Sequence, residues 1–436
     1  MIDRRRLLTL LTLAPLGVLT MSPALSGCAS PAAADDLARS DLAREAADPA
    51  SAALAHAAVT DLTADLHRTL AATVRGNLVS SPFSVAMALG MTVQGARGAT
   101  ASELLATLHA PSAADLASGL NALDAALATR AGTVRLFDGS EGEVALSSAN
   151  SLWGQRDTVW DKGFLDTLAR HFGSGMHQVD YRTAPDQARR EVNAWVGEQT
   201  RERIPELIAD GVFTVDTRLT LVNAVYLKAP WQLPFDTDAT RPAPFTRLDG
   251  STVQADLMHA PVTGRFGRGE GWVAATVPYA DGRLAMTVVL PDVGRFAELE
   301  QNLDGAWLRA VQSSLRDSQV QVSLPRWTTR SQLPLRPVLE QLGTRLAFTD
   351  DADFSGITSQ EPLLISAVIH EAFIAVDEAG TEAAAATAVV MMATGAPADP
   401  VTLIADRPFL YVIHDNAQGA LPTPLFIGRV LDPTGR

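Results

Sequence analysis

The sequence has a single cysteine, Cys28, and only two lysines among its 436 residues. One cysteine excludes disulfide bonds within the chain, so the stability of the fold must come from packing. The 35 Lys and Arg residues are outnumbered by 49 Asp and Glu residues, and the arginines are scattered along the chain. This distribution argues against a nucleic-acid partner, because such a partner needs a clustered basic surface.

Catalytic and metal-binding motifs are missing as well. The sequence contains neither a G-x-S-x-G elbow nor an H-E-x-x-H motif. Its eight histidines never fall at ligand spacing, and His171 and His177, six residues apart, do not share a helical face. We therefore expect no enzymatic activity, no metal and no cofactor, with an enzyme kept as an alternative class.

No apolar run is long enough to span a bilayer. Residues 7–19 are apolar, follow three arginines, and lead to Leu25-Ser26-Gly27-Cys28, which resembles a bacterial lipobox. We interpret residues 1–27 as a signal peptide and expect lipid attachment to Cys28. An ordinary secretory peptide is the alternative, and the leader also fits a twin-arginine export signal. The expected location is the cell envelope or the extracellular face, with the lipid as the only membrane anchor.

The mature chain divides by composition. Residues 28–55 are rich in Ala, Asp and Ser and indicate a flexible, solvated tether. Residues 56–436 are long enough to form a folded domain with a large core. The strongest core signal is residues 217–228, an apolar and β-branched run interrupted by Asn223, which predicts a strand buried on both faces.

Residues 377–400 (DEAGTEAAAATAVVMMATGAPADP) do not follow any of these patterns. Propensity alone leaves a short helix and a low-complexity linker both open. In an extended chain, alternate side chains share a face, and the face that carries Thr381 and Ala385 is small and uncharged. Glu382 lies on the opposite face, so we expect the segment to be able to join a sheet without burying a charge.

The segment from Glu378 to Thr387 closely resembles the hinge of the reactive loop in serpins, a family of serine protease inhibitors. Other stretches resemble serpin segments in family order, namely Ser81-Pro82-Phe83-Ser84, Gly95-Ala96-Arg97-Gly98, Thr217 to Lys228, Trp231 with Phe235, Asp353-Phe354-Ser355-Gly356, Arg407-Pro408-Phe409 and Pro424 to Val430. The resemblance implies an α+β serpin fold with a large mixed central sheet, additional sheets, about eight or nine helices and an exposed reactive loop at about residues 378–400.

The resemblance also implies roles for individual residues. The hinge would comprise Glu378, Gly380, Thr381, Glu382, Ala383, Ala384, Ala385, Ala386 and Thr387. A polar cluster beneath the opening of the sheet, called the shutter in this family, would comprise Ser81, Ser84, Asn223 and His370, and Trp231 would lie at the top of the sheet, called the breach. By the residues alone, Asn223 and His370 are equally explained as buried structural hydrogen-bonding groups.

The implied function is suicide inhibition of serine proteases by cleavage and insertion of the loop. The reactive bond is expected at Thr394-Gly395, within a window that also includes Met391, Met392, Ala393 and Ala396. No Lys or Arg occurs between Asp377 and Arg407, so a trypsin-like pocket would find no cationic partner. The expected partners of this monomer are elastase-, subtilisin- or chymotrypsin-like proteases. A non-inhibitory serpin-fold binding protein and a cross-class inhibitor of cysteine proteases remain alternatives.

Overall fold

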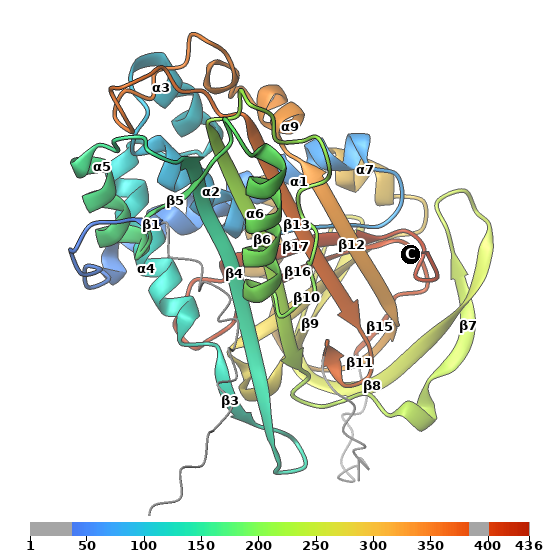
Figure 1. The fold of residues 1–436 in the computed structure, drawn as a ribbon. Helices are drawn as coiled ribbons and strands as arrows, with labels where there is room; N and C mark the ends of the chain where they lie inside the picture. Colours follow the sequence, from blue (N-terminus) through green and yellow to red (C-terminus); the bar gives the residue numbers. More distant parts are fainter. Residues whose placement is uncertain (1–36, 383–400, 436) are drawn as a thin grey trace, which may run out of the picture. The chain divides into compact units, whose positions relative to one another are not determined.

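Strand β6 (Leu219–Pro230) crosses the middle of a large sheet and is buried along almost its whole length, as its apolar sequence predicts (Figure 1). The computed structural model describes residues 37–382 and 401–435. The first sheet has the strand order β1 (Leu37–Ala38), β5 (Met176–Val179), β4 (Glu141–Gln155), β6, β14 (Gly380–Thr381), β13 (Ala367–Val376) and β12 (Trp327–Pro334), and β3 (Gly132–Arg135) pairs with β4. This sheet is mixed, because β6 is antiparallel to β4 and parallel to β13.

A second sheet lies beside the first. Its strand order is β15 (Val401–Ile404), β11 (Arg316–Pro325), β8 (Thr252–Gly269), β9 (Trp272–Pro278), β10 (Leu284–Pro291), β16 (Phe409–Asp415), β17 (Pro424–Val430) and β2 (Leu78–Ser80), and β7 (Arg241–Thr246) pairs with β8. Every residue of β10, β16 and β17 is buried, so these strands form the interior of this sheet.

Nine α-helices accompany the sheets within the described residues. They are α1 (Ala52–Thr73), α2 (Pro82–Val93), α3 (Gly98–Thr107), α4 (Ala113–Ala128), α5 (Lys162–Thr167), α6 (Pro185–Gln199), α7 (Phe296–Gln301), α8 (Gly305–Ser314) and α9 (Arg336–Gln341). Helix α2 is buried on all sides and begins at Ser81, whose hydroxyl accepts a hydrogen bond from the Ser84 N–H, with Pro82 in the first turn. The expected α+β fold with a large mixed sheet is confirmed.

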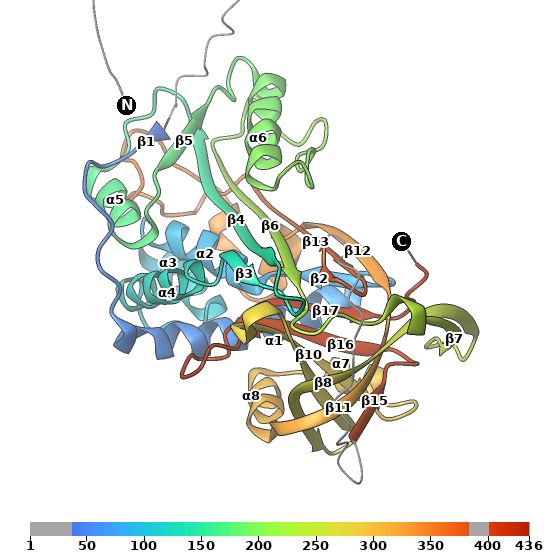
Figure 2. The same cartoon turned by 90° about the horizontal axis from the view of Figure 1, so that it is seen from below.

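The helices are distributed unequally over the two faces of the first sheet (Figure 2). Helix α6 covers the outer face, where Val192 and Val196 pack with Val222 of β6 and Ile369 of β13. Helices α1, α2 and α4 lie on the other face and belong to the main core. The first sheet is therefore buried on both sides, which explains the nearly continuous apolar sequence of β6.

The connection between α6 and β6, residues 200–218, crosses the outer face of the first sheet. Its Leu207 and Phe213 belong to the same apolar cluster as Val222 and Ile369. The side chain of Gln332, on β12, donates a hydrogen bond to the Leu207 carbonyl at 2.7 Å. The connection therefore covers the line where β6 meets β13.

The N-terminal part of the domain differs from the expected tether over residues 37–55. Strand β1 pairs with β5, with Leu37 opposite His177. The Arg44 guanidinium donates to Asn121 at 2.7 Å and forms an ion pair of 2.7 Å with Asp124. The polar composition of this segment suggests solvation, but the open edge of β5 supplies backbone partners that composition does not reveal. Residues 28–36, with Cys28, and the leader 1–27 lie outside the described residues.

Candidate functional site

The segment that resembles a hinge enters the first sheet at one end. In strand β14, Gly380 pairs with Pro230 and Thr381 pairs with Ala229, both of β6. On its other side Thr381 pairs with Val376 of β13. Of the predicted hinge, Ala383, Ala384, Ala385, Ala386 and Thr387 lie outside the described residues, as do Thr394-Gly395 and the window Met391, Met392, Ala393 and Ala396. Of the described hinge residues, Gly380 and Thr381 are thus strand residues between β6 and β13.

Both residues of β14 fit closely into their positions. The Thr381 side chain is fully buried, and its hydroxyl lies 2.7 Å from the hydroxyl of Tyr279. Gly380 has a φ of 154°, and a Cβ there would lie 2.3 Å from the Ala229 carbonyl oxygen. Only glycine can pass this close to the neighbouring backbone.

Glu378 anchors the base of the hinge. Its carboxylate forms an ion pair of 2.5 Å with Arg326 and accepts a hydrogen bond of 2.5 Å from Thr240. Burial favours the neutral acid, but these two partners outweigh it and hold the pKa of Glu378 below its usual value. The anchor is therefore a carboxylate at neutral pH.

Trp231 lies at the same end of the sheet, as the resemblance implies. Its ring stacks on that of Tyr279 with centroids 4.5 Å apart, and its Nε1 donates to the Asp377 carbonyl at 2.9 Å. Its backbone N–H donates to the Ala379 carbonyl at 2.9 Å. Trp231 therefore fixes the path of the chain just before β14.

Glu382 departs from the expectation that the hinge joins the sheet without burying a charge. Only 4% of its side chain is exposed, and its carboxylate lies 3.2 Å from Nε of Arg203. Burial raises the pKa of Glu382, and the Arg203 charge opposes that shift. The expectation is wrong at this position because the α6–β6 connection, which local sequence does not place, covers the outer face here.

The four residues of the predicted shutter lie together. Nε2 of His370 accepts a hydrogen bond of 2.9 Å from the Ser81 N–H, and the Ser81 hydroxyl accepts one of 3.4 Å from the Ser84 N–H. Nδ1 of His370 is hydrogen-bonded to Oδ1 of Asn223, and Nδ2 of Asn223 donates to Oδ1 of Asn150. The cluster joins β13, β6 and β4 to the start of α2.

This arrangement fixes the state of His370. Because Nε2 accepts from a backbone N–H, the ring proton must be on Nδ1, where it is donated to Asn223. Burial lowers the pKa of His370 to about 3, with the hydrogen bond to Asn223 acting in the opposite direction. A second proton on Nε2 would make it a donor that faces the Ser81 N–H, which is also a donor. His370 is therefore neutral in the folded protein.

We expect acid to weaken the fold through His370. Its pKa is about 3 in the folded protein and near 6.5 when unfolded, so the unfolded state binds the extra proton between these values. Stability is therefore complete above about pH 6.5 and falls by roughly 1.4 kcal/mol per pH unit below it, or about 2 kcal/mol at pH 5. Urea midpoints of the wild type and of His370→Gln, measured at pH 7, 6 and 5, would show a steeper loss in the wild type.

The matched control is His259→Gln, at an exposed position. It should follow the wild-type slope. His414, whose pKa burial lowers to about 4, titrates in all three proteins and cancels in the comparison. Parallel slopes for the wild type and His370→Gln would contradict the prediction.

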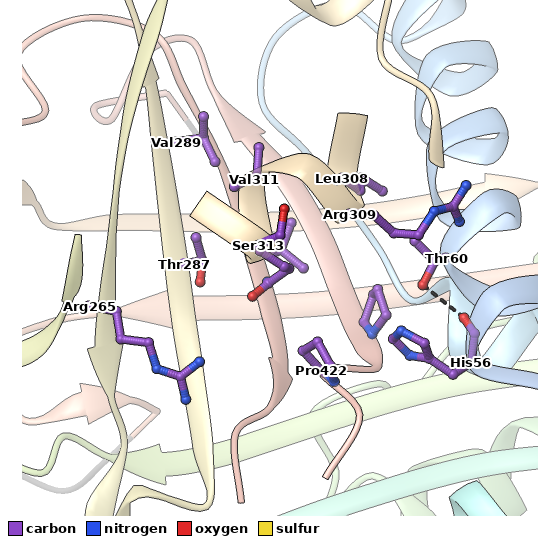
Figure 3. A pocket seen from close by; sticks show the side chains of 13 residues that line it. His56, Thr60, Arg265, Thr287, Val289, Leu308, Arg309, Val311, Ser313 and Pro422 are labelled. Carbon is purple, nitrogen blue, oxygen red and sulfur yellow. Dashed lines mark hydrogen bonds between the residues drawn. The ribbon is translucent and has the colours of Figure 1, made fainter. Parts of the chain in front are cut away.

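A separate pocket opens between α1, α8 and the second sheet and has a volume of about 300 Å³ (Figure 3). Val289, Leu308 and Val311 contribute to its mainly apolar wall, with the guanidinium groups of Arg265 and Arg309 on opposite sides. Arg309 is held by an ion pair of 2.9 Å with Asp61, and Arg265 donates to Asn416 at 2.9 Å. The pocket has the chemistry to bind a small apolar molecule that carries an anionic group.

Neither a metal site nor a membrane-spanning helix is found within residues 37–382 and 401–435. No group of three or more His, Cys, Asp or Glu side chains in this part of the chain could hold a metal ion. Within the same residues, no helix is both long and apolar enough to cross a membrane.

Sequence reasoning did not identify several residues that the structure brings to the site. Asn150 is opposite Asn223 in the β4–β6 register. Its position as an Asn within a predicted buried strand is the feature of the sequence that could have identified it. Tyr279, Arg326 and Arg203 contact the hinge from distant segments, and their sequence surroundings give no sign of it.

Comparison with known proteins supplies a family context. A family profile described as "Serpin (serine protease inhibitor)" matches residues 57–433. A serpin-like protein of Thermococcus kodakarensis is 36% identical over 379 residues, covering 86% of this chain and 85% of the relative. The leukocyte elastase inhibitor of Sus scrofa is 34% identical over 392 residues, covering 86% of this chain and 99% of the relative.

Solved structures agree with this match. The native state of tengpin, a thermophilic serpin, superposes with a TM-score of 0.77 at 26% identity, covering 90% of this chain and 96% of that one. Serpin48 of Tenebrio molitor superposes with a TM-score of 0.71 at 29% identity, covering 86% and 97%.

Proposed function

The chain belongs to the serpin family, and on this basis we propose that it inhibits serine proteases as a suicide substrate. The observation that carries the proposal is the position of β14, where Gly380 and Thr381 already pair between β6 and β13. If the chain after Thr381 becomes extended, it can continue to pair with the same two strands, β6 and β13. Since the family is one of protease inhibitors, no catalytic activity is proposed for the chain.

The proposed reaction begins as ordinary proteolysis. The protease serine oxygen bonds to the carbonyl carbon of the residue before the reactive bond, proposed as Thr394. The peptide C–N bond breaks, and the amine of Gly395 leaves with a proton from the protease histidine. The freed segment then pairs with β6 and β13 and carries the attached protease with it before water can cleave the ester. Loop insertion in serpins is an established case of strand addition.

The proposed targets have pockets for small or apolar side chains. The window from Met391 to Ala396 contains Met, Ala, Thr and Gly, with no cationic residue. Relatives that share 34% identity are named leukocyte elastase inhibitors. This supports elastase-like enzymes as partners, with subtilisin- and chymotrypsin-like enzymes as further ones.

Mixing the protein with purified proteases tests both mechanism and specificity. We expect an SDS-resistant complex with elastase- or subtilisin-type enzymes and none with a trypsin-type enzyme. Mass spectrometry of the released C-terminal peptide should place the cut between residues 391 and 396. Cleavage without any complex would contradict inhibition, and complex formation only with a papain-type enzyme would indicate the cross-class alternative.

We also propose that the mature protein is exported and held at the cell envelope by a lipid on Cys28. The support is the lipobox-like Leu25-Ser26-Gly27-Cys28 after an apolar stretch. Cys28→Ser should abolish labelling by a radioactive fatty acid in the producing cell. Labelling that persists in this variant would disprove the anchor.

The pocket beside α8 favours a second candidate function, a carrier for a small apolar anion. Binding of anilinonaphthalene sulfonate, measured by fluorescence, should weaken about tenfold or more in Val311→Trp, which fills the pocket. Complex formation with proteases should be unchanged in this variant. Equal dye binding by the wild type and Val311→Trp would remove the second candidate.

A further inference from the structure

The described chain leaves the strand conformation at Glu382. Its φ of 48° lies in the left-handed region, whereas a strand requires a negative φ. A non-glycine residue pays roughly 1 kcal/mol for this conformation. Glu382 still donates its N–H to the Ala375 carbonyl at 2.9 Å, but the ladder between β6 and β13 does not continue in extended form beyond Thr381.

The side chain of Glu382 is held where the strand stops. This side chain is 4% exposed, and its carboxylate forms the 3.2 Å ion pair with Arg203, whose side chain is 55% exposed. Burial raises the pKa of this carboxylate, and the Tyr226 hydroxyl of β6 acts with Arg203 in the opposite direction. Loss of Arg203 would leave a desolvated charge with less compensation, so the present conformation of Glu382 depends on this contact.

Arg203 belongs to the α6–β6 connection, which is fixed to the sheet on either side of the ion pair. Arg201 forms two hydrogen bonds with Glu143, just inside β4, at 2.9 and 2.7 Å. On the other side, Leu207 is held by Gln332 of β12. The connection therefore lies over the line between β6 and β13 that an inserting strand must open.

We propose that Arg203 is a positioning residue that, through Glu382, stops the reactive loop after Thr381 and slows its insertion into the sheet. The proposal rests on the inhibitory function proposed above. For the strand to grow past Thr381, Glu382 must adopt a negative φ and the connection must move away from the sheet. Each of these movements displaces one partner of the ion pair, so the pair raises the barrier to insertion.

A peptide with the sequence of residues 381–394 (TEAAAATAVVMMAT) tests this without any protease. The fluorescent peptide is incubated with the full-length protein, and its incorporation is followed by anisotropy and native gels. We expect Arg203→Gln and Glu382→Gln each to incorporate it roughly fivefold faster than the wild type. The double variant should be no faster than either single variant, because both substitutions remove the same interaction.

Arg190→Gln is the matched control, since it removes an exposed arginine of α6 that pairs with Asp186 of the same helix and not with the hinge or the connection. It should incorporate the peptide at the wild-type rate. Equal rates for the wild type and Arg203→Gln would overturn the proposal, as would equal acceleration by Arg190→Gln. If the wild type and all variants exclude the peptide, the sheet does not accept a strand, and the proposed inhibitory function fails together with the role of Arg203.

Discussion

Cleavage of the loop between residues 383 and 400 by a metalloprotease should raise the melting temperature of the protein by on the order of 10 °C. A metalloprotease uses water as its nucleophile and forms no acyl-enzyme, so the nicked protein is released. About a dozen residues could then pair with β6 and β13, adding roughly as many backbone hydrogen bonds at about 1 kcal/mol each. A gain on the order of 10 kcal/mol corresponds to a shift on the order of 10 °C in a domain of this size.

Scanning calorimetry of the intact and the nicked protein measures this shift, with mass spectrometry to confirm a single cut. The control is the same nick in Thr381→Arg, where the strand cannot pass the first buried position. There the gain should be absent or much smaller. Equal melting temperatures of intact and nicked wild type would indicate a non-inhibitory serpin.

Thr381→Arg itself should convert the protein from an inhibitor into a substrate. The Thr381 side chain is fully buried, and its neighbours include the stacked rings of Tyr279 and Trp231. A guanidinium group there would be buried without a carboxylate partner, which costs several kcal/mol. The substituted hinge should therefore leave the sheet in the intact protein, and insertion would have to bury the guanidinium again. This slows insertion on the order of a hundredfold, so hydrolysis of the acyl-enzyme finishes first. The yield of SDS-resistant complex with an elastase-type enzyme should fall at least tenfold while cleavage continues.

Two variants separate the effect of a buried charge at Thr381 from the effect of any added arginine and from the effect of any substitution at Thr381. Thr328→Arg adds the same charge at an exposed position of the same sheet and should leave complex formation unchanged. Thr381→Ser keeps the hydroxyl that meets Tyr279 and should behave like the wild type. Because Thr381 is buried before cleavage as well, the melting temperature of each intact variant must be recorded. Full complex formation by a folded Thr381→Arg would show that the hinge does not insert.

Both predictions rest on the position of the hinge before cleavage. The hinge is already in the sheet at Gly380 and Thr381, so insertion extends an existing strand rather than starting a new one. Starting a strand costs conformational entropy, because the chain must be held in place at the sheet. In the intact protein, β14 and the anchors at Glu378 and Trp231 already hold the hinge there. What remains is the opening of β6 from β13, where the parallel pairs run from Ala367 to Ala372.

The sequence by itself determined the parts of this protein that depend on local pattern. The nearly continuous apolar and β-branched run at residues 217–228 predicts a strand covered on both faces, and most of it forms β6 in the middle of the first sheet. Ser81 before Pro82 marks a helix start, because a hydroxyl and a proline satisfy the first turn whatever surrounds it. The small residues of the hinge and the absence of Lys and Arg around the expected reactive bond are also explicit in the sequence.

Only the tertiary structure decided which distant groups meet these segments. The pairing of β1 with β5 uses backbone groups, which composition does not encode, so residues 37–55 were expected to form a flexible tether. Asn150 joins His370 and Asn223 only because the strand register places it opposite Asn223. Glu382 is buried and paired with the half-exposed Arg203 because the connection after α6 packs across the sheet at that point. Such contacts depend on how whole helices and strands pack against one another. The free energy of that packing is distributed over many residues, so no single segment of the sequence predicts it.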